Sequence, residues 1–238
     1  MQQTCLPDWL ASKYICTHTM DIFRKGGIML SEKEKRIAAI GAYTAVSDVG
    51  YLVKECRAAL ATGLTVNEMK EIFLQLCAYC GFPRGLQAIN IFMAVLEEAG
   101  GKVEMGRTPS PISDSRSKYE RGEKVQCAVT GWTKEELRSG AMGFIPKIDC
   151  MLKEYIFADI YESDVLSYAE REIATLGAQL SMDGIEPMIE AHINAGLNVG
   201  LSAEKIDGII KTVELAFGRA KGDRGRKLLA NVLSRKNN

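Results

Sequence analysis

The chain has 238 residues, of which 47% are hydrophobic and 25% are charged, and 30 basic residues balance 30 acidic ones. This composition is that of a globular protein, and the absence of a basic surplus argues against binding to nucleic acid or to an anionic membrane. No apolar run is long enough to span a bilayer, and the opening residues, MQQTCLPDWLASK, lack the pattern of a secretory signal. We therefore expect a cytoplasmic protein with no membrane partner.

Cysteine and histidine usage limits the possible chemistry further. The seven cysteines are odd in number and irregularly spaced, which favours a reduced compartment over a disulfide framework. The two histidines are His18 and His192. With so few imidazoles and mostly scattered thiols, we expect no structural zinc site.

Residues 30–83 are typical of a helix, a second helix, a tight turn and a third helix. Gly63 stands where the second helix must stop, the usual place of a C-terminal glycine. Thr65 and, later in the chain, Ser202 are expected to be N-caps, with Glu68 completing a capping box at Thr65. Gly81-Phe82-Pro83 is expected to end the third helix, because a proline can begin a helix but cannot continue one.

The third of these predicted helices carries an apolar stripe. Its members recur at i, i+3, i+4 and i+7, which is the spacing of one helix face: Phe73, Leu76, Cys77 and Cys80. Further along, residues 106–117 (GRTPSPISDSRS) are rich in serine and proline and are typical of a surface linker. The linker divides the chain into a first module, residues 1–105, and a second module, residues 118–238.

The second module repeats the first. Residues 192–209 match residues 55–72 at a constant offset of 137 (192 − 55 = 137), and residues 166–178 match residues 30–42 at an offset of 136 (166 − 30 = 136). Five positions are identical at the larger offset: Ala58/Ala195, Leu60/Leu197, Gly63/Gly200, Leu64/Leu201 and Ile72/Ile209. A repeat of this length indicates one supersecondary unit used twice. Convincing strand patterns are absent, so we expect an all-α fold.

Several of these segments resemble the carboxymuconolactone decarboxylase family, which includes the AhpD-like alkylhydroperoxidases. They are AALATGLTVNEMKEIFLQLCAYCGFP at 58–83, AHINAGLNVGLS at 191–202, SKYERGEKVQCAVTG at 117–131 and FADIY at 157–161. The resemblance covers most of the chain as two fused family modules. It implies an all-α fold, a small-molecule substrate, no metal or organic cofactor, and a homo-oligomer, with the fused pair forming a trimer that imitates a hexamer.

The two copies differ in chemistry at one pair of positions. His192 falls on the recurrent histidine of the family, and Glu172 falls on the glutamate that often accompanies it one helix earlier. The counterparts in the first copy are Glu55 and Arg36. A histidine beside a carboxylate suits proton transfer, whereas an Arg–Glu pair neutralises itself and arginine stays protonated. We infer that the second copy kept a site, that the first copy lost its own, and that the resemblance makes His192 and Glu172 the catalytic pair of a decarboxylase-like enzyme.

A second hypothesis is a thiol-dependent peroxide reductase that uses the CxxC formed by Cys77 and Cys80. It requires exposed thiols with lowered pKa values. In AhpD-like members the redox cysteines lie four and seven residues before the family histidine, but here those positions are Met188 and Ile185. The apolar stripe favours instead a packing role for the two thiols, since buried cysteines act as small hydrophobes.

Two further residues are candidates for substrate binding. Asp159 and Tyr161, in FADIY, could line a pocket, although Asp21 and Phe23 repeat the pattern and a capping or packing role is as well supported. A third hypothesis of another class is a non-catalytic oligomer or binding protein that inherited the fold. It predicts a His192 with no pocket beside it.

Overall fold

The computed structural model describes residues 29–236, and within this range the protein consists of helices and loops with no β-strand. The predicted all-α class is confirmed for these residues, and none of their helices is long and apolar enough to cross a membrane. His18 and the segment 21–23 lie outside the described residues. The helices are α1 (Glu32–Val46), α2 (Val49–Ala61), α3 (Val66–Cys80), α4 (Phe82–Glu98), α5 (Lys118–Thr130), α6 (Lys134–Leu137), α7 (Gly140–Phe144), α8 (Pro146–Met151), η2 (Leu152–Tyr161), α9 (Tyr168–Ser181), α10 (Glu186–Asn198), α11 (Ala203–Phe217) and α12 (Arg219–Lys236).

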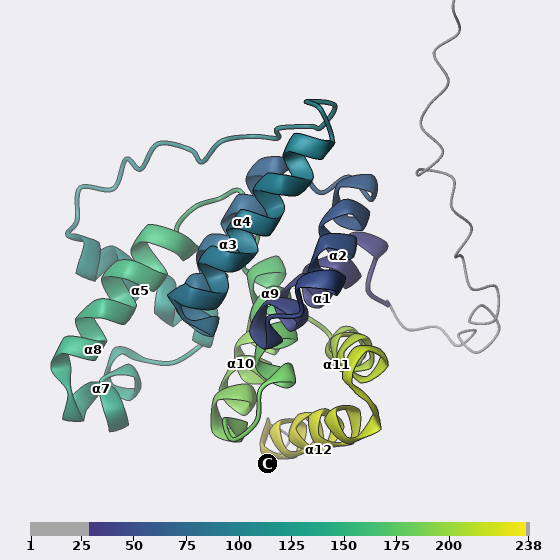
Figure 1. The fold of residues 1–238 in the computed structure, drawn as a ribbon. Helices are drawn as coiled ribbons and strands as arrows, with labels where there is room; N and C mark the ends of the chain where they lie inside the picture. The colour runs from purple at the N-terminus through teal and green to yellow at the C-terminus, as the bar shows by residue number, and fades with distance from the viewer. Residues whose placement is uncertain (1–28, 237–238) are drawn as a thin grey trace, which may run out of the picture.

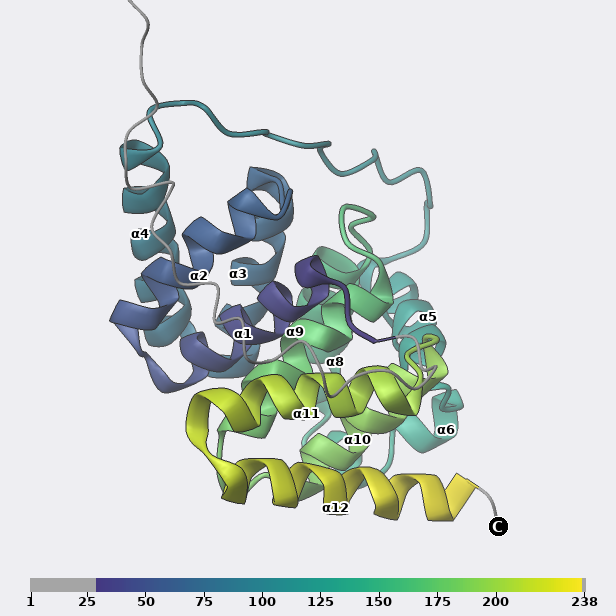
Figure 2. The ribbon, with the colours of Figure 1, turned by 90° about the vertical axis from the view of Figure 1, so that its right-hand side faces the viewer.

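Two sets of four helices share order and length. Helices α1–α4 have 15, 13, 15 and 17 residues, and helices α9–α12 have 14, 13, 15 and 18. We call α1–α4 the first repeat and α9–α12 the second repeat. Sequence analysis predicted three helices in each; a fourth, α4 or α12, follows the glycine that ends the third. Figures 1 and 2 show α1 and α9 in the middle of the molecule and α12 at its lower edge, and Figure 2 shows α4 at the left edge.

The helix boundaries follow from the predicted local signals. Thr65 caps α3 and forms a reciprocal capping box with Glu68, and Ser202 caps α11 by accepting from the backbone of Lys205. Helix α3 ends at Cys80, one residue before a glycine with φ of 82°. These ends orient the third helix of each repeat against the first helix of both repeats, which is what builds the site described below.

Helices α1 and α9 approach each other so closely that glycine is required on both. A Cβ added to Gly41 would lie 2.3 Å from the carbonyl oxygen of Ala174, and one added to Gly177 would lie 2.2 Å from that of Ala38. The two contacts exchange at the sequence offset (38 + 136 = 174; 41 + 136 = 177). The repeats are therefore related across this crossing as two subunits of a symmetric dimer are.

One hydrophobic core joins the repeats. It contains fully buried side chains from both, including Ile40 and Leu76 of the first repeat and Ile173 and Ile209 of the second. A smaller cluster of α5, η2 and α10 contains Val125, Val129, Phe157, Ile160, Tyr161 and Ala195, and Tyr79 of α3 packs against both clusters. The apolar stripe predicted for α3 is confirmed, since all four of its members are buried.

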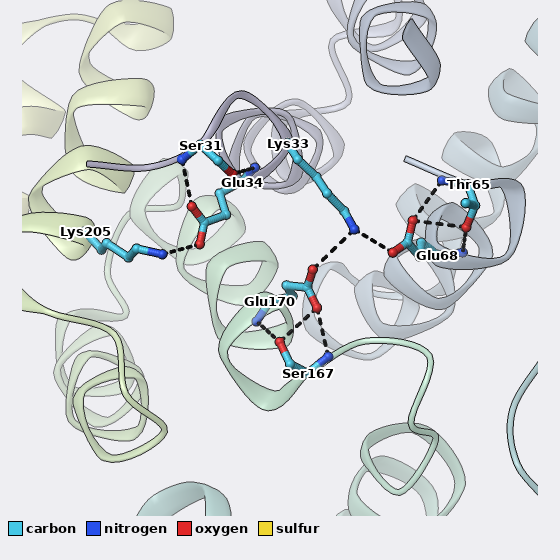
Figure 3. A network of polar contacts seen from close by, with 8 residues as sticks. All are labelled: Ser31, Lys33, Glu34, Thr65, Glu68, Ser167, Glu170 and Lys205. Atoms are coloured by element: carbon cyan, nitrogen blue, oxygen red, sulfur yellow. Dashed lines mark hydrogen bonds and ion pairs between the residues drawn. The ribbon is translucent and has the colours of Figure 1, made fainter. Parts of the chain in front are cut away.

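A partly buried ionic network connects the N-terminal ends of α1, α3, α9 and α11 (Figure 3). Glu34 pairs with Lys205 at 2.5 Å. Symmetry would place Glu170 against Glu68, two like charges, at the equivalent point (34 + 136 = 170; 68 + 137 = 205). Lys33 lies between these carboxylates, 2.6 Å from Glu68 and 3.5 Å from Glu170, and so replaces a repulsion with two attractions.

The segment between the repeats lies over one side of the molecule. Residues 106–117 contain no helix, as predicted for a linker, and run from α4 to α5 in both views (Figures 1 and 2).

Helix η2 is a π-helix of 10 residues, a wide form that is frequent at functional sites. The fully buried Lys153 of η2 bonds to Asp149, at 2.8 Å, and to the hydroxyl of Tyr119, at 2.9 Å, and so ties η2 to α5.

Candidate functional site

The two residues that the family resemblance singled out lie in contact. Nδ1 of His192, on α10, is 2.8 Å from Oε2 of Glu172, on α9. The Glu172 side chain is fully buried, whereas that of His192 is 21% exposed. The N-terminal cap of α9 fixes the position of Glu172 along that helix. Helix α10 begins just after Ile185, has a proline in its first turn, and places His192 beside Glu172.

The second carboxylate oxygen of Glu172 also has a donor. The hydroxyl of Tyr161, on η2, donates to Oε1 at 2.9 Å, and Tyr161 is itself buried. The same hydroxyl lies 3.1 Å from that of Tyr79 and 3.4 Å from that of Thr175. Because Tyr161 gives its one proton to Glu172, Tyr79 is the donor in the pair of phenols. A chain of hydrogen bonds thus runs from Tyr79 through Tyr161 and Glu172 to His192.

Electrostatics keep the two phenols of this chain protonated. Burial, followed by the nearby charge of Glu172, raises the pKa of Tyr161 well above its usual range, and the same two causes raise the pKa of Tyr79. Both phenols therefore remain protonated at neutral pH and remain able to donate. The buried carboxylate of Glu172 accepts two hydrogen bonds, which offsets the cost of removing its charge from water.

The contact with Glu172 also assigns the histidine tautomer. A carboxylate can only accept, so Nδ1 of His192 carries a proton and Nε2 of the neutral ring keeps its lone pair. Among residues 29–236 no group forms a hydrogen bond with Nε2 of His192. This nitrogen is also not among the side-chain atoms of these residues that are buried without a hydrogen-bond partner. The arrangement can therefore accept a proton at Nε2 and return it, with Glu172 orienting the ring and stabilising the imidazolium.

Helix α3 of the first repeat contributes contacts to this site, which the sequence did not indicate. Glu71, Gln75 and Tyr79 are four residues apart and share one helix face. Gln75 donates at 2.8 Å to the hydroxyl of Thr175 and to the carbonyl of Arg171, and Glu71 pairs with the fully buried Arg171 at 2.7 Å. The spacing of four residues was the sequence signal that could have identified this helix face, but the CxxC formed by the neighbouring cysteines directed the interpretation to redox chemistry.

The two residues predicted to bind substrate have separate locations. Tyr161 is part of the hydrogen-bond chain. Asp159 is exposed, and its carboxylate pairs with Lys118 at 2.7 Å, so the structure does not bring it to Glu172 or His192. The reason is helical geometry, because residues two apart on a helix point to different sides.

The two cysteines of the CxxC lie inside the fold. Cys77 is 4% exposed and Cys80 is 6% exposed. Burial raises the pKa of the Cys77 thiol, and it raises that of Cys80 to about 12. The redox hypothesis requires the opposite, exposed thiols with lowered pKa values. Between them, Tyr79 turns toward the site.

The equivalent position in the first repeat holds an ion pair. Nη1 of Arg36 lies 2.9 Å from Oε2 of Glu55, and the two side chains are 31% and 15% exposed. Each charge is satisfied by the other, as their sequence positions suggested. Arginine stays protonated, and the carboxylate beside it is already paired, so neither group is a free proton acceptor.

Comparison with known proteins adds no assignment, because no family model and no curated protein matches the chain. Residues 29–236 contain no group of three or more histidine, cysteine, aspartate or glutamate side chains placed to hold a metal ion. The geometry of the site and the sequence resemblance are therefore the basis for a functional proposal.

Proposed function

We propose that the protein is an acid–base enzyme of the carboxymuconolactone decarboxylase type, built from two fused modules and acting on a small carboxylated or lactone substrate. The observation that carries this proposal is the 2.8 Å contact between the fully buried carboxylate of Glu172 and Nδ1 of the partly exposed His192. It commits one ring nitrogen to orientation and leaves the other for chemistry. The sequence resemblance supplies the substrate class.

In the proposed reaction His192 acts as the general acid. The bond between the substrate carbon and its carboxylate breaks, carbon dioxide leaves, and the electron pair passes into the conjugated lactone carbonyl. The Nε2–H of the imidazolium then protonates the carbon, and the ring regains a proton from solvent. A positioned acid of this kind contributes about 10²–10⁴-fold to a rate. Glu172 does not change charge in this scheme; it holds the ring and stabilises its charged form.

A homo-oligomer is part of the same proposal. Besides the resemblance, its support is a row of exposed apolar side chains on α4: Phe82, Leu86 and Met93 are 58%, 54% and 53% exposed. Their spacing of four and seven places them along one side of the helix, the pattern of a helix-packing face. Light scattering on the purified chain tests this; a trimer is expected, and a monomer at all concentrations contradicts it.

The catalytic proposal is tested with carboxymuconolactone and a panel of carboxylated γ-lactones as probes, following release of carbon dioxide. His192→Gln is compared with the wild-type chain and with Glu55→Gln, which changes the equivalent position of the first repeat. We expect turnover by the wild type and Glu55→Gln, and a loss of about 10²–10⁴-fold in His192→Gln. Full turnover in His192→Gln contradicts the role of the histidine. Absence of turnover by the wild type with every probe contradicts the substrate class.

A further inference from the structure

We infer that Tyr79, supplied by the first repeat, is a positioning residue for the His192 site of the second repeat. The inference rests on the proposed function, since it assigns a role within that site. Tyr79 contacts two members of the site without being part of the Glu172–His192 pair. Its hydroxyl is 3.1 Å from that of Tyr161, and its ring meets the His192 imidazole edge to face, with ring centroids 5.2 Å apart and planes at 80°.

The two contacts restrain the histidine in complementary ways. The aromatic contact limits rotation of the imidazole, so that Nδ1 stays directed at Glu172. The hydroxyl donates to Tyr161, and this donation polarises the bond that Tyr161 makes to Glu172. Tyr79 thereby holds both the ring and the chain of donors behind its carboxylate.

The position of Tyr79 is itself fixed by polar contacts between the repeats. One turn before it on α3, Gln75 bonds to both the backbone and a side chain of α9; a turn earlier, Glu71 pairs with Arg171. Gln75 and Arg171 are completely buried, so these contacts fix the register of α3 against α9 with little competition from water. The Tyr79 hydroxyl is consequently delivered to Tyr161 by a rigid element.

The internal repeat provides a comparison that favours a specific role over general packing. The counterpart of Tyr79 in the second repeat is Ala216 (79 + 137 = 216), on α11, the helix that packs against α1 of the repeat carrying Arg36 and Glu55. At this position of the third helix there is a phenol on the helix that packs against the repeat with the histidine, and an alanine on the helix that packs against the repeat with the ion pair. An ion pair needs no third group to orient it, whereas a histidine that must present one nitrogen does.

The test uses a His18→Gln background, in which His192 is the only histidine and its imidazole can be followed alone by NMR. The readout is the exchange rate of the Nδ1 proton with water, measured in Tyr79→Phe, which keeps the ring, and Tyr79→Leu, which removes it. Tyr119→Phe is the matched control, because it also deletes a hydroxyl with a buried partner but lies in the α5–η2 cluster.

We expect exchange to rise about 2–10-fold in Tyr79→Leu, the fold-change that corresponds to the loss of one aromatic contact, and less in Tyr79→Phe. Tyr119→Phe should leave exchange unchanged. Equal exchange in all variants overturns the positioning role, whatever the activity. Faster exchange in the Tyr79 variants supports the positioning role. If no lactone is turned over, that result counts only against the proposed reaction. If Tyr79→Leu fails to fold, Tyr79→Phe against Tyr119→Phe decides the question.

Discussion

The two repeats place different chemistry at the same point of the same helix pair. In the second repeat a buried carboxylate holds one nitrogen of a partly exposed histidine; in the first, arginine and glutamate neutralise each other. The ion pair is partly exposed, and such pairs contribute about 0–1 kcal/mol to stability. The carboxylate of Glu172 is completely buried and depends on its two donors. Only one of the two equivalent positions therefore buries a charge that depends on its hydrogen-bond donors.

The largest effect is expected on activity from Glu172→Gln. The amide keeps the shape of the side chain but removes the charge that stabilises the imidazolium, and by donating to Nδ1 it would exclude the doubly protonated ring that acts as the acid. Turnover in the lactone assay should fall by up to about 10⁴-fold, as when the carboxylate that orients a catalytic histidine becomes an amide. Turnover by the Glu55→Gln variant should fall by less than twofold. Similar losses in both variants would show that the repeats do not differ in function.

The close crossing of α1 and α9 provides the second test. Gly41→Ala and Gly177→Ala each drive a Cβ into a carbonyl oxygen of the other helix, at 2.3 and 2.2 Å, so the helices must separate. We expect each substitution to lower the free energy of unfolding by about 3 kcal/mol. Urea denaturation followed by circular dichroism measures both. A loss in only one of the two variants would break the symmetric relation between the repeats.

A smaller difference in stability is expected between the two charged positions. Tyr161→Phe removes a donor from the buried Glu172, and leaving such a group short of a partner costs about 1–3 kcal/mol. Arg36→Met, which breaks the partly exposed pair with Glu55, should cost less than about 1 kcal/mol. The same denaturation experiment compares them. A larger loss of stability in Arg36→Met than in Tyr161→Phe would mean that the Arg36–Glu55 ion pair contributes more to stability than the hydrogen bond to Glu172.

An effect that is absent at neutral pH, and is therefore the smallest there, develops in alkali. Burial raises the pKa of Cys56 and of Cys80 to about 12, whereas the second repeat has Ile193 and Phe217 at the equivalent positions (56 + 137 = 193; 80 + 137 = 217). A thiol whose pKa is raised by folding contributes stability below its unfolded pKa, about 8.5, and that stability is lost as pH rises toward 12. Melting temperatures between pH 8 and 11 should therefore fall less steeply in Cys80→Ala than in the wild type. Parallel curves would contradict a buried, neutral Cys80.

Much of the fold could be predicted from local sequence signals. The caps at Thr65 and Ser202, the glycine before Pro83 and the apolar stripe of α3 act over a few residues, so they are visible in the chain itself. The family resemblance pointed to Glu172 and His192, and the internal offset showed that the residue types differ at the equivalent positions, Arg36 and Glu55. Their contact is a finding of the fold, since they lie on different helices.

The rest of the site depends on contacts that no local pattern encodes. Gln75 and Thr175 are 100 residues apart, and Tyr79 and Tyr161 are 82 apart. The role of Tyr79 was also missed because it lies within the CxxC motif, whose two cysteines suggested redox chemistry. Asp159 shows the reverse error: adjacency in FADIY suggested a common pocket with Tyr161, but helical geometry directs it to the surface.

The central claim is that Glu172 holds Nδ1 of His192 and leaves Nε2 available. The most direct measurement is the pattern of imidazole nitrogen NMR shifts in the neutral ring of the His18→Gln protein, compared with the same protein carrying Glu172→Gln. Our account predicts a single tautomer protonated at Nδ1, with a slowly exchanging proton, and a mixture or reversal of tautomers once the carboxylate is an amide. A ring protonated at Nε2, or one unaffected by Glu172→Gln, would contradict it.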